Sequence, residues 1–235
     1  MRREAPVTAD TFLSVPSCDV SHLSEDVDVV IVDAPDGTPC TAVEASHARD
    51  APDAMRRSIK AAASDLTRWD FDQNGPLLAA DLTVRDAGNI ATEPATPGRN
   101  RELIRAATRA ILDVSAVPVL LGGDDSVPIP FFDAFETHGP ITIVQVDAHL
   151  DWREERNGIR HTFSSPMRRA SEMPWVERIV QVGMRGIGAS RKGGPRRCFA
   201  LGSSDHSRVQ RAPAWHEASS RLHSRGGTLR RNDRL

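Results

Sequence analysis

The sequence predicts an α/β protein in which a mostly parallel sheet is covered by helices on both faces, a three-layer arrangement. Four short apolar runs rich in β-branched residues recur along the chain and are typical of buried strands. Segments with apolar residues at helical spacing alternate with them, and this alternation favours parallel strands joined by helices. At 235 residues with 39% apolar content, the chain is long enough to bury one sizeable core.

The first predicted strand is Val27–Val32, because this run is short and β-branched and is followed by the turn residues Pro35, Gly37 and Pro39. A helix is predicted after it, over residues 54–66. A second helix is predicted over residues 102–114, again from the spacing of its apolar residues. The apolar positions of the two helices are Met55, Ile59, Ala62, Ala63 and Leu66, and Leu103, Ala107, Ala110, Ile111 and Val114.

Three further strands are predicted near residues 117–121, 141–146 and 178–183. Between the last two, Ser165 followed by Pro166 predicts the start of a helix, with the serine as N-cap and the proline at the first helical position. The sequence contains no internal repeat.

Acidic residues follow two of the predicted strands at the point where each strand ends. The run PITIVQVDAHLDWR leads into Asp147, His149 and Asp151, and the run VPVLLGGDDS leads into Asp124 and Asp125. Side chains two residues apart on an extended chain point the same way, and ligands of open α/β sheets gather outside the carboxyl ends of the strands. Carboxylates combined with an imidazole suit Mn²⁺, Fe²⁺ or Zn²⁺ better than Ca²⁺. The sequence therefore predicts a metal site at these strand ends.

Simpler interpretations of the same residues remain open. The acids can be solvated turn residues, and His149 a histidine in a capped loop. One of Asp124 and Asp125 can cap the helix that follows the Gly122–Gly123 turn. A phosphate-binding loop is disfavoured, because no Lys-Ser or Lys-Thr pair follows the glycines.

These segments resemble the arginase/agmatinase family of ureohydrolases. GGDDS is similar to the family's GGDHS and DAHLD to its DAHxD, with ASHARDAPDAMRRS, DAGN and SPMRRA in the expected order. The resemblance implies an arginase-like fold, a homo-oligomer, and two Mn²⁺ ions that serve the hydrolysis of a guanidino group to urea and an amine. By position it implies that Asp147, His149 and Asp151 are metal ligands. It places Asp125 where the family has its first histidine ligand, with Asp124 as the neighbouring acid.

Two departures from the family pattern bear on activity. Asp125 puts a carboxylate where the family has a neutral imidazole, which is expected to tighten the binding of a hard cation and make its bound water less acidic. The family's second D-x-D ligand pair has no counterpart after Gly188, where the acids are Asp205, Glu217 and Asp233. We therefore expect a fold that is incomplete at its C-terminus and holds one Mn²⁺ ion well, or none.

The function implied by the resemblance is Mn²⁺-dependent cleavage of a small guanidino compound, weakened or lost here because of the missing ligand pair. The alternative is a catalytically inactive family member that binds one metal ion weakly or assembles with its relatives. The leaving amine needs a proton, and the family's histidine position is occupied by Phe163. His161, two residues earlier, is the candidate catalytic proton shuttle, and a surface-loop role is its competing interpretation.

The composition of the chain changes near residue 190. Residues 1–190 carry 19 basic and 29 acidic residues, a charge of −10, whereas residues 191–235 carry ten Arg and one Lys against three acids, a charge of +8. We expect residues 1–190 to form a partial ureohydrolase-like domain. Residues 191–235 are expected to be an Arg-rich, disordered tail outside the family, the product of a frameshift or a truncated gene. A nucleic-acid-binding arm is a third interpretation, which the scarcity of aromatic residues there disfavours.

The sequence also predicts a cytoplasmic protein with no membrane partner. No apolar stretch approaches the roughly 20 residues of a membrane helix, and the start, MRREAPVTADTF, lacks the apolar segment of an export signal. Cys18, Cys40 and Cys198 are widely spaced and form no C-x-x-C pair, so reduced thiols are expected.

Overall fold

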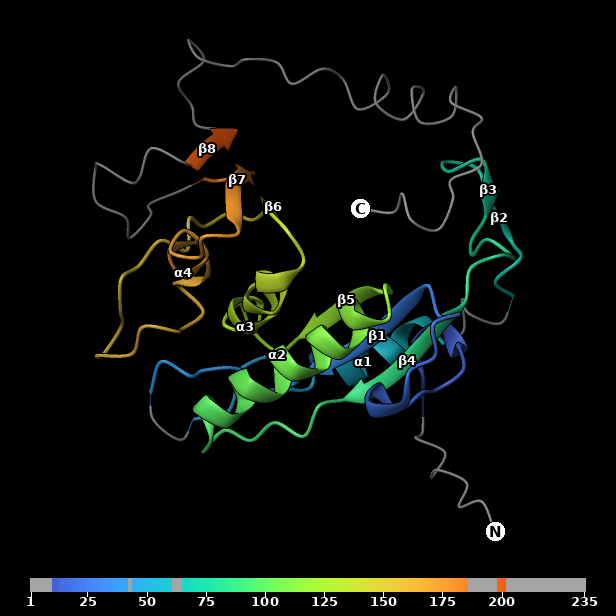
Figure 1. Cartoon of the computed structure of the whole chain (residues 1–235), viewed down its shortest axis with the longest axis horizontal. Coiled ribbons are helices and arrows are strands. Elements are labelled where there is room, and N and C mark those ends of the chain that lie inside the picture. Colours follow the sequence, from blue (N-terminus) through green and yellow to red (C-terminus); the bar gives the residue numbers. More distant parts are fainter. Residues whose placement is uncertain (1–9, 42–43, 61–64, 186–197, 202–235) are drawn as a thin grey trace.

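The computed structural model describes residues 10–41, 44–60 and 65–185, and the backbone of residues 198–201. Its parallel strands form two three-stranded sheets, and a short antiparallel hairpin lies beside the first of them (Figure 1). The strands are β1 (Val29–Ala34), β2 (Trp69–Asp70), β3 (Gly75–Pro76), β4 (Val84–Asn89), β5 (Val117–Gly122), β6 (Ile141–Val146), β7 (Val176–Val182) and β8 (Cys198–Leu201). The α-helices are α1 (Ala51–Ile59), α2 (Pro97–Asp113), α3 (Pro128–Asp133) and α4 (Pro166–Ala170), with 3-10 turns at Phe12–Ser14, Val20–His22 and Ala134–Thr137.

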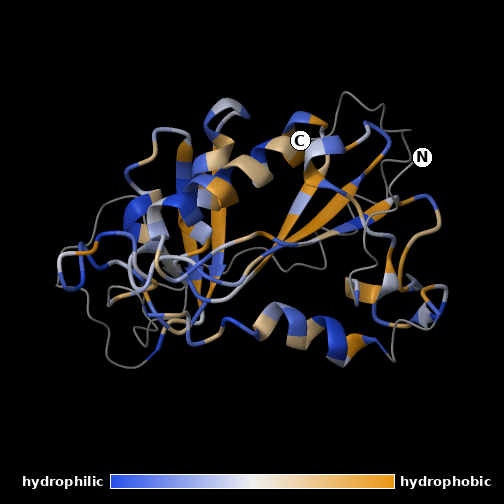
Figure 2. Cartoon of the chain, turned by 90° about the horizontal axis from the view of Figure 1, so that it is seen from below, coloured by the Kyte–Doolittle hydropathy of each residue, from blue (hydrophilic) through white to orange (hydrophobic). Residues whose placement is uncertain are grey.

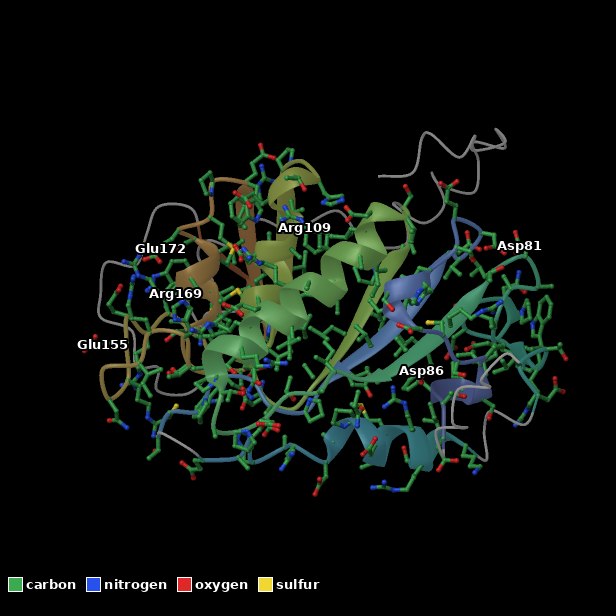
Figure 3. The ribbon with its side chains drawn as sticks, turned by 60° about the horizontal axis from the view of Figure 1, so that its bottom comes forward. Asp81, Asp86, Arg109, Glu155, Arg169 and Glu172 are labelled. Atoms are coloured by element: carbon green, nitrogen blue, oxygen red, sulfur yellow. The ribbon has the colours of Figure 1, made fainter. Side chains whose placement is uncertain are left out.

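The first sheet has the strand order β4-β1-β5, and both pairs are parallel. One face of β1 carries Val30 and Val32, which pack against Ile111 of α2. The opposite face carries Ile31, which packs with Val84 of β4 in a separate apolar cluster. Figure 3 shows α1 and α2 on opposite sides of this sheet, so β1 is covered on both faces. Figure 2 shows the corresponding concentration of apolar residues on the strands.

The second sheet has the order β6-β7-β8 and is also parallel. Its core joins Ile143 of β6 and Ile179 of β7 to Met167 and Ala170 of α4. Within the described structure, β5 and β6 are edge strands of their respective sheets. Val146, at the end of β6, is 80% exposed.

The structure confirms the predicted strands and most of the predicted helices, with shifts of a few residues at their ends. The second predicted helix begins earlier, at Pro97, because Pro97 occupies the first turn, where a missing N–H costs nothing. The helix at Ser165 is confirmed, although the Ser165 side chain makes no capping hydrogen bond. Part of the first predicted helix, residues 61–64, lies outside the described residues. The mostly parallel sheet is present as two separate sheets rather than one.

Strand β4 was not predicted, and α3 was anticipated only as the helix that follows the Gly122–Gly123 turn, without bounds. The β4 segment, VRDAGN, has few apolar residues, and its buried side chains include Asp86, which is 1% exposed. Such a strand lacks the apolar pattern that predicts strands. The α3 segment is only six residues long and contains two prolines within its first three positions. A helix of this length has no readable period.

The segment that forms β8 lies inside the stretch that the sequence predicted to be a disordered tail. Residues 198–201 form a strand that pairs in parallel with β7, with Val180 opposite Phe199. The run CFAL is a short apolar segment among arginines, and overall composition outweighed it in the prediction. The rest of residues 191–235 lies outside the described residues.

A buried ion network ties α1 to the first sheet. The Arg56 side chain is 3% exposed and donates from Nε and Nη2 to the two carboxylate oxygens of Asp86, at 2.9 and 2.6 Å. Its Nη1 also contacts Asp33 of β1 and donates to Oδ1 of Asn89 at 3.1 Å. Figure 3 labels Asp86 in the region between the sheet and α1. One guanidinium is therefore shared between two carboxylates that are both fully enclosed.

None of the helices in the described part of the chain combines the length and the apolar character that crossing a bilayer requires.

Candidate metal centre

Three carboxylates meet where β5 and β6 end. Asp125 lies three residues after β5, Asp147 follows β6 directly, and Asp151 lies in the loop beyond it. One oxygen from each carboxylate lies within 4.8 Å of the others. We call these three residues the carboxylate triad. The sequence placed all three among the candidate ligands, and the structure brings them together.

Asp125 is positioned by a close approach between the ends of β1 and β5. The Gly123 amide donates to the Ala34 carbonyl at 2.9 Å, and a Cβ at Gly123 would lie 1.9 Å from the carbonyl oxygen of Pro35. Only glycine fits this position. The next residue, Asp124, accepts from the backbone N–H of Ser126 at 2.9 Å and from its hydroxyl at 2.5 Å. Asp124 is therefore the acid that closes the turn, and the Asp125 carboxylate remains available to face Asp147 and Asp151.

Asp147 and Asp151 are held by the amide of Gln145. Its Nε2 donates to Oδ2 of Asp151 at 2.8 Å and to Oδ2 of Asp147 at 3.3 Å. The fully buried Gln181 of β7 donates in turn to Oε1 of Gln145 at 2.5 Å and to the carbonyl of Leu150 at 2.8 Å. This pair of glutamines fixes the orientation of two triad carboxylates from within the sheet.

The chain between Asp147 and Asp151 is not extended, which corrects the alternation expected from the sequence. It bends at residues 148–149, and Asp151 has a φ of 48°, in the left-handed region that aspartate tolerates better than most residues. This bend brings Asp147 and Asp151 together. The strand alternation predicted from the sequence does not continue beyond Asp147. His149 lies inside the bend, so its side chain points in a different direction from those of Asp147 and Asp151.

His149 does not join the triad in the structure. Its side chain is 74% exposed, and its Nδ1 lies 3.3 Å from Oδ1 of Asp147. The imidazole thus contacts one triad member from the solvent side. Its role as a metal ligand stays a prediction.

His161 lies away from the triad. It lines a different cavity, formed by α2, α3 and α4, and burial followed by the charges of Arg101, Arg169 and Arg160 lowers its pKa. The residues that line the cavity beside the triad do not include it. The structure therefore gives no support from proximity for the predicted proton shuttle.

The electrostatics of the triad are dominated by burial and by like charge. Burial, and then the negative charge of Asp147, raise the pKa of Asp151 to about 7, although the hydrogen bond from Gln145 opposes the shift. Burial, and then the charges of Asp147 and Asp124, raise the pKa of Asp125, while His149 and His47 oppose this. Three carboxylates this close repel one another, and a cation among them would remove the repulsion.

Sequence reasoning missed Gln145, Gln181 and His47. Gln145 sat inside a run interpreted only as a buried strand, yet it lies two residues before Asp147, on the same face of an extended chain. A polar side chain at that position was the available signal. Gln181 stands in the strand predicted near residues 178–183 and His47 in the segment ASHARDAPDAMRRS, but only tertiary packing brings them near the triad.

A cavity of about 410 Å³ opens beside the triad. We call it the β6 cavity. Asp125 and Asp147 contribute to its wall, and β6 with three phenylalanines of the α3 region supplies most of the rest. The phenylalanines are Phe131, Phe132 and Phe135. The cavity thus combines an anionic end with an apolar body.

The donor set of the triad fits a divalent cation. Carboxylate oxygens are preferred by hard cations such as Mn²⁺ and Mg²⁺, and three oxygens within 4.8 Å of one another can reach one ion. The raised pKa of Asp151 is the expected mark of carboxylates gathered without a compensating charge. Within the described residues, the triad supplies three ligand groups.

Parallel strands that end in gathered carboxylates define an α/β protein with an acidic, cation-type site at the carboxyl ends of its strands. Residues 27–200 match the sequence model of the Arginase family. The chain belongs to the arginase family.

Comparisons with individual proteins agree with this assignment. The chain is 29% identical over 184 residues to the mitochondrial agmatinase of Gallus gallus, covering 77% of this chain and 51% of that protein. It is 30% identical over 115 residues to the mitochondrial guanidino acid hydrolase of Homo sapiens, covering 48% of this chain and 33% of that protein. The chain therefore spans about half the length of these relatives or less.

Solved structures support the fold. The proclavaminate amidino hydrolase of Streptomyces clavuligerus aligns with a TM-score of 0.62 at 22% identity, over 79% of this chain and 59% of that one. A Trypanosoma cruzi formiminoglutamase structure with Mn²⁺ aligns with a TM-score of 0.60 at 23% identity, over 92% of this chain and 63% of that one. The arginase-like α/β arrangement expected from the sequence is confirmed.

Proposed function

We propose that this chain is a metal-dependent hydrolase that cleaves a guanidino group to urea and an amine. The observation that carries the proposal is the carboxylate triad, whose oxygens lie within 4.8 Å of one another at the ends of two parallel strands. Membership of the arginase family supports the reaction class. The names of the relatives, agmatinase and guanidino acid hydrolase, support a guanidino substrate.

Some residues of the site would bind a cation, and others would orient those ligands. Asp125, Asp147 and Asp151 would hold Mn²⁺, and His149 is the fourth candidate ligand. When bound, such a cation lowers the pKa of a water molecule and so supplies a nucleophile at neutral pH. Gln145 keeps two of the carboxylates oriented through its hydrogen bonds. In the reaction one water is consumed, the bond between the guanidino carbon and the substituted nitrogen breaks, and that nitrogen leaves as an ammonium group.

The β6 cavity fits the shape and charge of such a substrate. A guanidinium is a planar cation, and the carboxylates at the end of the cavity attract it. The phenylalanine walls suit an alkyl chain, because burial of apolar surface is favourable there. A linear guanidino compound with a short alkyl chain therefore matches the cavity.

Urea release from guanidino compounds tests the function. We expect release from agmatine or 4-guanidinobutyrate that requires added Mn²⁺ and stops on chelation, measured as urea by a colorimetric assay. Metal content is measured in parallel after Mn²⁺ loading and desalting. Less than one ion per chain together with no urea would reject the proposal.

A catalytically inactive metal-binding member of the family is the second candidate. The observation that favours it is the size of the ligand group, which contains three carboxylates within the described residues. Stoichiometric Mn²⁺ binding without urea from any guanidino compound would support this candidate over the hydrolase.

The substitution Asp125→His tests whether this carboxylate is a ligand. Replacing an anionic ligand by a neutral imidazole is expected to weaken Mn²⁺ binding by roughly tenfold, and turnover should change with it. Titration calorimetry and the urea assay measure the two effects. The matched control is Asp72→His, because Asp72 is exposed in the β2–β3 turn, and it should leave both unchanged. Unaltered affinity in Asp125→His would mean that Asp125 does not contact the metal.

A further inference from the structure

A second cavity lies apart from the triad, between α2, α3 and α4. Its volume is about 450 Å³, and none of the residues that line it lines the β6 cavity. We call it the α2–α4 cavity. Arg101 and Arg105 of α2, His161, and Arg169 of α4 contribute its basic side chains. The proposed function uses none of these residues.

Arg101 is the basic group in this cavity that lacks a counterion. Its Nη1 donates to the hydroxyl of Thr38 at 2.8 Å, and no ion pair joins it to any carboxylate of the described residues. Burial lowers its pKa, because the desolvated guanidinium loses part of its hydration, and nearby Glu102 opposes the shift. A partly buried cation without a partner is stabilised by an anionic ligand.

The other arginines around the cavity already have partners. Arg169, which is 4% exposed, lies 3.1 Å from Oε1 of Glu154 and 3.1 Å from Oε2 of Glu172, and Figure 3 shows Arg169 and Glu172 close together at α4. Arg105 lies 3.3 Å from Asp133. Among the residues that line the cavity, the three guanidinium groups of Arg101, Arg105 and Arg169 are matched in number by the carboxylates of Glu102, Asp133 and Glu172. Arg101 differs from the other two because no ion pair joins it to a carboxylate of the described residues.

His161 adds a hydrogen-bonding group near Arg101. Burial, followed by the charges of Arg101 and Arg169, lowers its pKa, so the imidazole favours its neutral form. A neutral imidazole has one N–H donor, which can reach an oxyanion held by Arg101. The wall also includes the carboxylates of Glu102, Asp133 and Glu172, and its apolar part includes Ile129, Met173 and Trp175.

We propose that the α2–α4 cavity binds a small organic oxyanion, a carboxylate or a phosphate ester, with its charged group against Arg101 and His161. Its apolar part lies against the wall that contains Trp175. The site is independent of the candidate metal centre, so it goes beyond the proposed function and does not rest on it.

Titration calorimetry of the full chain tests this site with three probes of similar shape: butyrate, butyl phosphate and the neutral butanamide. The ionic strength is held constant with NaCl. We expect saturable binding of at least one of the two anions and none of butanamide. Arg101→Gln should weaken anion binding by roughly tenfold or more, because a charged hydrogen bond is lost. Which anion binds more tightly distinguishes a carboxylate ligand from a phosphate ligand.

Arg109→Gln is the matched control. Arg109 lies two turns further along α2, contacts Thr137 and Glu136, and does not line the cavity (Figure 3). The Arg109→Gln variant should bind both anions with the affinity of the unaltered chain. His161→Gln is the second cavity variant, which keeps the test valid if Arg101→Gln unfolds.

Three results would overturn the proposal: no saturable binding of either anion, equal binding of butanamide, or unaltered affinity in both cavity variants. Asp151→Asn, which removes a triad carboxylate, should leave anion binding intact. Loss of binding in that variant would show that anion binding depends on the triad and would also overturn the proposal.

Discussion

Arg56→Met is expected to destabilise the protein by about 3–5 kcal/mol at pH 7, which is the usual effect of removing one partner from a buried ion network. Arg56 contacts Asp33 and Asp86, and both carboxylates are fully enclosed. Methionine fills much of the volume but leaves two buried negative charges without a counterion. Urea unfolding followed by circular dichroism measures the loss. Arg57→Met is the matched control, because Arg57 is the exposed neighbour on the same helix, and it should change stability by less than about 0.5 kcal/mol.

The loss in Arg56→Met should depend on pH. Burial alone would raise the pKa of Asp86, but the hydrogen bonds from Arg56, Phe12 and Gly88 bring it below its ordinary value. A lowered folded-state pKa stabilises the protein above the unfolded pKa of about 4, and this contribution disappears as the pH falls through the folded pKa. The difference between Arg56→Met and the unaltered chain should therefore shrink below pH 4. A difference under about 1 kcal/mol at pH 7 would show that the network is not a major source of stability.

Asp151→Asn is expected to stabilise the metal-free protein and to abolish its stabilisation by Mn²⁺. The pKa of Asp151 is about 7 in the folded chain, against an ordinary value of 3.8. Between these values the folded state retains a proton that the unfolded state has released. Stability therefore falls as the pH rises through this window, by up to about 4 kcal/mol in total. Asparagine does not titrate, so the variant should lack this slope and unfold at higher urea concentration than the unaltered chain at pH 8.

Added Mn²⁺ should reverse that order. A ligand at 100 times its dissociation constant stabilises the folded state by about 2.7 kcal/mol, and the variant, which lacks one triad carboxylate, should gain little or none of this. Urea unfolding from pH 4.5 to 8, with chelator and then with MnCl₂, measures both effects. Glu155→Gln is the control, since Glu155 is an exposed acid in the loop that follows the triad (Figure 3), and it should behave as the unaltered chain does. Equal Mn²⁺ stabilisation in Asp151→Asn would exclude Asp151 as a ligand.

The sequence predicted four strands, β1, β5, β6 and β7, and the triad residues, because both depend on local pattern. The runs before Asp125 and Asp147 are apolar and β-branched and end abruptly, so the position of each acid at a strand end could be read directly. The bend at Ala148–His149 could not be read, because it depends on how Asp151 is held by Gln145 and by α4, whose Arg168 amide donates to the Asp151 carbonyl at 3.2 Å. The exposure of His149 follows from that bend and was missed with it.

Long-range contacts account for the other differences. β4 is a strand because the backbone of VRDAGN pairs with β1 and because Arg56 neutralises Asp86, and neither partner is near it in the sequence. His161 was chosen by its spacing from a family motif, yet the loop that carries it packs toward α2 rather than toward the triad. Motif order predicts which residues are present, whereas packing decides which of them meet.

The hydrogen bond between Gln181 and Gln145 links the candidate metal centre to β7, the middle strand of its sheet, which pairs with β8. Gln181 lies opposite Ala200 of β8 in the parallel register, and its amide supports the one that orients Asp147 and Asp151. The four residues of β8 belong to the stretch that composition alone had assigned to a non-family tail. A chain shortened at residue 190 would lack β8, the parallel partner of β7. We expect this truncation to destabilise β7 and, through Gln181, the residues that orient the acidic site.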